Sequence, residues 1–98
     1  MANANVSLQI LPRGKTDEEI YALVDKAIDV IRESGVRYEV GPLDTTMEGD
    51  YDELMDVVKR AQEAVIAAGS DRVISIVKID YKPSGLNWDE KVGKYRKG

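Results

Sequence analysis

The sequence predicts one α+β domain whose elements follow one another in the order β-α-β-β-α-β. The first observation is a helix-start pattern that occurs twice, 34 residues apart: Thr16 precedes Glu19 by three positions, and Asp50 precedes Glu53 in the same way. An N-cap residue followed three positions later by Glu is a capping box. The second observation is that segments of alternating apolar and polar residues flank both helical patterns, as expected for strands. A duplicated strand–helix–strand unit explains both observations.

Each element follows from its own local signals. Gly35 and Gly69 close the two helical patterns, because the residue after a helix often needs a positive φ angle. Right-handed crossovers place both helices on one face of a four-stranded antiparallel sheet ordered 4-1-3-2, which is the ferredoxin-like arrangement. Stacked helical repeats share the 34-residue period, but they need three copies and two helices per copy. We expect strands at 6–11, 36–40, 44–49 and 72–80, helices at 17–34 and 51–68, and a short helix with Trp88 within 86–95.

Composition limits the chemistry of this chain. The 98 residues predict a single ferredoxin-like domain, 1–98, with a core at about 5–80 and a C-terminal extension at 81–98. The chain has no Cys and no His, so it lacks thiolates, the usual general base near neutral pH and the commonest transition-metal ligand. We therefore expect no catalytic residue, no metal site and no cofactor, and predict a protein that binds a ligand without transforming it.

Charge and hydropathy restrict the partners. A net charge of −4 does not suit a protein that binds a phosphate backbone. The basic tail formed by Lys91, Lys94, Arg96 and Lys97 is interpreted as a solvated chain end. Since no signal peptide and no membrane-length apolar run is visible, we expect a cytoplasmic protein that contacts neither nucleic acid nor membrane.

The predicted fold leaves one sheet face without helices, and strand alternation assigns residues to it. Leu11, Ile74 and Ile76 fall on this face and are too apolar for full solvation. We therefore predict a homo-oligomer, a dimer or tetramer, in which this face or the edge of the second strand is covered. The polar residues assigned to the same face are Ser7, Gln9, Arg37, Glu39, Thr46, Glu48 and Lys78.

Five polar residues in or beside the strands are candidate ligand-binding groups: Gln9, Thr45, Thr46, Glu48 and Ser75. Thr46 and Glu48 should lie beside Gln9, whereas Ser75 projects to the opposite face. Their alternative role is to bond one another, a partner subunit or, for Glu48, a basic side chain. The acidic residues around Asp50 are interpreted as helix-capping groups and not as a cation site.

Thr45 to Gly49, and Ala68-Gly69 together with Arg72, are the most specific of several segments that match a known family. By these segments the chain resembles the thiamine-binding, YkoF-like family of small ferredoxin-like proteins. The resemblance covers about residues 5–80, with a weaker match at Glu90–Val92. The further matching segments are Val6–Pro12, Glu33–Val40, Asp50 with Glu53, Val57–Val65, Val73 and Lys78–Asp80.

The resemblance implies a dimer or tetramer that binds thiamine or its hydroxymethylpyrimidine half, with no established catalysis. This chain departs from the family pattern at Gln62, where relatives often carry His, at Ser75, where Thr is frequent, and at Tyr81-Lys82, where Asp-Arg is expected. Three alternatives remain open: a regulatory amino-acid-binding module, a small dimeric α+β-barrel isomerase, and an assembly module without ligand.

Overall fold

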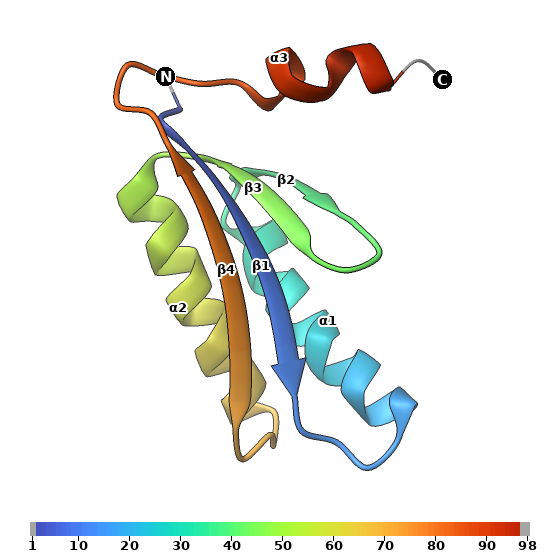
Figure 1. The fold of residues 1–98 in the computed structure, drawn as a ribbon. Helices are drawn as coiled ribbons and strands as arrows, with labels where there is room; N and C mark the ends of the chain where they lie inside the picture. The colour runs from blue at the N-terminus through green and yellow to red at the C-terminus, as the bar shows by residue number, and fades with distance from the viewer. Residues whose placement is uncertain (1, 97–98) are drawn as a thin grey trace.

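The computed structural model describes residues 2–96 and has the predicted ferredoxin-like architecture (Figure 1). The antiparallel sheet has the order β2-β3-β1-β4, so the first and third strands are central as predicted. Figure 1 shows α1 and α2 side by side behind the sheet, on one of its faces. The elements are β1 (Ala4–Pro12), α1 (Asp17–Glu33), β2 (Arg37–Val40), β3 (Thr45–Gly49), α2 (Tyr51–Ala67), β4 (Val73–Tyr81), α3 (Trp88–Val92) and the 3-10 turn η1 (Gly93–Tyr95).

Local signals account for the helix ends. The Thr16 side chain accepts a hydrogen bond from the N–H three residues further on at 3.1 Å, and the Asp50 side chain does the same at 3.4 Å. The glycines that follow the two helices have positive φ angles, 81° at Gly35 and 119° at Gly69. The two long helices therefore begin and end within one residue of their expected positions, and the short helix with Trp88 lies within the expected range.

Strand register confirms the predicted faces. Residue pairs such as Leu8–Thr45 and Leu8–Val77 place alternate positions of the strands against the helices, where they form the core. β1 begins at Ala4, two residues earlier than predicted, because Ala4 and Asn5 also pair with both neighbouring strands. The fully buried side chains include Val6, Ile31, Met47, Leu54, Val57 and Val65.

The opposite side of the sheet, called the helix-free face below, carries the other alternate residues. Residues 87–96, called the strap below, cross this face near one end of the sheet, where α3 is drawn in red in Figure 1. Lys91 pairs with Asp80, and Arg96 Nη2 lies 2.6 Å from Glu39 Oε2. Both basic side chains remain exposed to solvent, as the interpretation of the basic tail expected, but they also pair with the sheet, while Lys97 lies outside the described residues. Within residues 2–96, no helix combines the length and the apolar character that crossing a bilayer requires.

Candidate functional site

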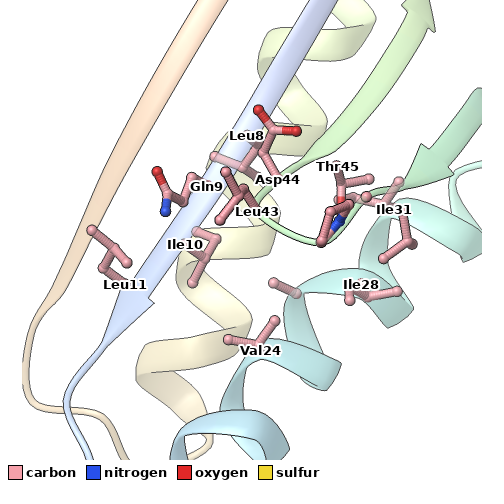
Figure 2. Close-up of a pocket in the computed structure, with 14 residues that line it drawn as sticks. Leu8, Gln9, Ile10, Leu11, Val24, Ile28, Ile31, Leu43, Asp44 and Thr45 are labelled. Atoms are coloured by element: carbon pink, nitrogen blue, oxygen red, sulfur yellow. The ribbon is translucent and has the colours of Figure 1, made fainter.

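A pocket of about 250 Å³ lies between α1, the second half of β1 and the loop that joins β2 to β3. Figure 2 shows Val24, Ile28 and Ile31 on α1, facing the loop that carries Leu43 and leads into β3 at Thr45. Because most of the lining is apolar, the pocket offers a surface for the faces of a small ring. Its apolar walls are formed by Leu8, Ile10, Leu11, Val24, Ala27, Ile28, Ile31, Val40, Pro42 and Leu43.

The pocket exists because two neighbouring elements differ in length. α1 has 17 residues and is about 25 Å long, whereas β2 has four residues and spans about 13 Å. The sheet edge therefore ends before the helix does, and part of the apolar side of α1 stays uncovered. A tight loop follows, in which the Gly41 N–H donates to the Asp44 carbonyl at 2.8 Å. A Cβ atom at Gly41 would lie 3.0 Å from that carbonyl oxygen, so glycine suits this close approach.

Three polar residues line the pocket: Gln9, Asp44 and Thr45. Thr45 is buried, opposite Leu8 in the register, and projects toward the helices. The Asp44 carboxylate is partly exposed, and its oxygen lies 3.9 Å from the Nζ atom of the exposed Lys78, which is a long ion pair. Gln9 lines the rim, and Figure 2 shows its side chain on the opposite side of β1 from Ile10.

The structure does not bring the five predicted ligand-binding residues into one site. Gln9 and Thr45 line the pocket. Thr46 and Glu48 lie opposite Ser7 and Asn5 of β1, so the prediction that Glu48 lies beside Gln9 was wrong, because the β1–β3 ladder ends at Leu8. Ser75 faces the helices as its register predicted, and its hydroxyl donates to Gln62 Oε1 at 2.7 Å. Whether any of the five contacts a ligand stays a prediction.

Glu48 is already surrounded by donors of its own chain. Its carboxylate accepts hydrogen bonds from Asn5 Nδ2 at 3.0 Å, from Arg37 at 2.8 Å and from the Trp88 N–H at 2.6 Å, and the residue is only 7% exposed. Arg37 also pairs with Asp89 at 2.8 Å. The hydrogen bond to Asp89 first, and that to Glu48 next, raise the pKa of Arg37 above its ordinary value, against the opposing effect of desolvation. The salt-bridge role that the sequence left open for Glu48 is thus the one observed.

Sequence reasoning missed two residues that the structure places beside the candidate binding groups: Asp44, which lines the pocket, and Trp88, whose N–H donates to Glu48. Asp44 follows the Gly41-Pro42 break and precedes Thr45, so its place at a strand entrance was a usable signal. No local pattern connects Trp88 with Glu48, because they are far apart in the chain. In the part of the chain that the structure describes, no cluster of three or more His, Cys, Asp or Glu residues is arranged to hold a metal ion.

The comparisons of this chain with known sequences and structures agree on one protein family. The sequence model of the family described as "Thiamine-binding protein" matches residues 6–96. A UPF0045 protein of Clostridium perfringens is 57% identical over 98% of this chain and 100% of its own length. The structure of a Bacillus cereus domain of unknown function, DUF77, is 51% identical with a TM-score of 0.90, covering 98% of this chain and 93% of that one. A Thermotoga maritima structure, described as a candidate thiamine biosynthesis/salvage protein, is 37% identical with a TM-score of 0.87, covering 96% and 99%.

Proposed function

Because this chain belongs to the thiamine-binding protein family, we propose that it is a non-catalytic binding protein for thiamine or for its hydroxymethylpyrimidine half. The observation that carries the proposal is the pocket beside α1, where apolar walls meet Thr45 and Asp44. Small-molecule sites are typically mostly apolar concavities with a few placed polar groups. The absence of His and Cys from the sequence supports binding without catalysis.

The chemistry of the pocket suits an aminopyrimidine. The ring faces would contact the aliphatic walls, and the exocyclic amine would donate to the Asp44 carboxylate. The Thr45 hydroxyl both donates and accepts, so it can pair with a ring nitrogen. For whole thiamine, the positive thiazolium would lie at the pocket mouth, where Asp44 supplies the opposite charge.

Pocket size favours the smaller ligand. The volume of about 250 Å³ is below the roughly 300–1,000 Å³ that is usual for drug-sized ligands. The hydroxymethylpyrimidine half therefore fits as the enclosed part, with the rest of thiamine outside the walls. Of the five predicted residues, this proposal keeps Thr45 and, at the rim, Gln9. A ligand on the helix-free face would instead contact Thr46, and would reach Glu48 only after the strap moved.

Calorimetry with hydroxymethylpyrimidine and thiamine tests the proposal, together with thermal melts. A ligand that binds only the folded state stabilises it by about 2.7 kcal/mol when its concentration is one hundred times Kd. We expect measurable heat and a higher melting temperature with either compound. No heat and no change in melting temperature at millimolar ligand would end the hypothesis, and preferential binding of amino acids would support the regulatory alternative.

We further infer that the protein self-associates through the helix-free face or the β2 edge. Leu11, Ile74 and Ile76 are 40%, 51% and 49% exposed on that face. They lie toward the end of the sheet opposite the strap, where β1 and β4 pair Leu11 with Ile74. Burying this apolar group against a second copy removes it from water, which favours association. Light scattering at micromolar concentration measures the expected dimer or tetramer.

A further inference from the structure

The strap is attached to the helix-free face at a central ionic contact. Glu48 on β3 accepts the Trp88 N–H at 2.6 Å, which fixes the first turn of α3 on the sheet. Arg37 on β2 bridges the two parts, because it pairs with Glu48 and with Asp89 of the strap, both at 2.8 Å. Glu48 thus joins the sheet, the bridging arginine and the strap backbone in one contact.

Two outer contacts reach the other strands. Lys91 donates to Asn5 Oδ1 on β1 at 2.7 Å and pairs with Asp80 on β4. At the far end, Arg96 pairs with Glu39 on β2 at 2.6 Å. Apart from Asn5, the partners in these outer pairs are about half exposed, so water and salt weaken them. The strap is therefore held in part by exposed charges, which lie around the buried Glu48.

The strap has one well-buried apolar anchor, Trp88, which is 7% exposed. The Arg37 guanidinium lies 3.9 Å from the centre of its ring. Trp88 is not part of the continuous core beneath the sheet, so that core is complete without it. Within residues 2–96, its indole Nε1 is buried without a hydrogen-bond partner. Leaving this donor unpaired makes the burial of Trp88 less favourable, and therefore weakens the attachment of the strap to the sheet.

The backbone hydrogen bonds that tie the chain to the N-terminal segment end at residue 86. The Leu86 N–H donates to the Ala2 carbonyl at 3.0 Å, which holds the chain as far as residue 86. Gly85, just before it, has a backbone φ of 107°, a conformation that residues other than glycine rarely adopt. Beyond this point the strap depends on the side-chain contacts described above, so it can separate without breaking a strand pair.

We propose that residues 87–96 detach from the sheet as a unit when the contacts of the Glu48 carboxylate break. Detachment exposes the polar end of the helix-free face. Asn5 and Glu48 are each 7% exposed while the strap is seated. Release gives solvent and partner molecules access to the Glu48 carboxylate, which otherwise accepts the Trp88 N–H. The strap is thus a cover formed by the chain itself over an acidic site, and its position depends on ionic strength.

Trp88 reports the position of the strap directly, because it is the only tryptophan in the sequence. The test is acrylamide quenching of Trp88 fluorescence in Glu48→Gln, which keeps the side-chain shape and removes the charge. Glu63→Gln is the matched control, since it removes the same charge from an exposed position on α2. We expect a red-shifted emission and a rise in the quenching constant of about threefold in Glu48→Gln, as for local opening of a weakly held segment. Equal quenching in folded Glu48→Gln and wild type overturns the proposal.

A second perturbation applies even where Glu48→Gln does not fold. Asp89→Asn changes an exposed strap residue, and raising salt from about 0.1 M to about 1 M shortens the Debye length from about 10 Å to about 3 Å. We expect both to increase quenching while far-UV circular dichroism stays native. Unchanged quenching in both overturns the proposal. So does simultaneous loss of the circular dichroism signal, because the strap would then not move separately from the domain.

Discussion

Two neighbouring threonines separate the two possible ligand sites. Thr45 projects into the pocket beside α1, and Thr46 projects to the helix-free face, because successive residues of β3 point to opposite faces. Thr45→Val and Thr46→Val each replace a hydroxyl with a methyl group of nearly the same shape. Valine is also favourable in strands, so both variants should fold.

The expected effect of Thr45→Val follows from the burial of that side chain. Thr45 is 6% exposed. A ligand group that bonds the Thr45 hydroxyl would therefore find little water to bond instead when valine removes that hydroxyl. Leaving a buried polar group unsatisfied costs about 1–3 kcal/mol, which corresponds to a rise in Kd of roughly 5- to 150-fold. Thr46→Val should leave Kd unchanged, because its hydroxyl lies on the other side of the sheet.

The assay is calorimetry with hydroxymethylpyrimidine on wild type and both variants, with thermal melts to verify folding. A weakened Thr45→Val beside an unaffected Thr46→Val supports the pocket. If Thr45→Val binds normally with an unchanged melting temperature, the Thr45 contact is refuted. If Thr46→Val is the variant that loses affinity, the reasoning has selected the wrong face and the ligand lies on the helix-free side.

Three further predictions concern charge, assembly and stability. Asp44→Asn should weaken thiamine more than hydroxymethylpyrimidine in calorimetry, because only thiamine carries a cation; equal losses would show that the charge is not used. Ile76→Asp should shift light scattering toward the monomer, since a carboxylate would be buried at the contact, and an unchanged mass would remove this face from the interface. Asp50→Ala should lower stability by about 1 kcal/mol and the melting temperature by about 4–8 °C, because the α2 N-cap is lost; an unchanged melt would contradict the capping role.

The sequence by itself determined the architecture and the two faces of the sheet, because those depend on short-range patterns. The capping residues Thr16 and Asp50 sit at the predicted helix starts. Alternation with a period of two residues assigned Thr46 to one face and Ser75 to the other, and the register agrees. These patterns predict the fold well because each strand or helix is stabilised by burying its one apolar face.

Only the tertiary structure decided which polar groups are available to a ligand. Glu48 and Thr46 have equivalent positions in the strand pattern, yet Glu48 accepts three hydrogen bonds, one of them from the backbone of Trp88. Asp44 and Thr45 line a pocket because α1 extends beyond the short edge strand and forms the wall opposite them. The physical reason is that periodicity specifies the direction of a side chain, whereas its partners depend on how segments distant in the sequence cross in space.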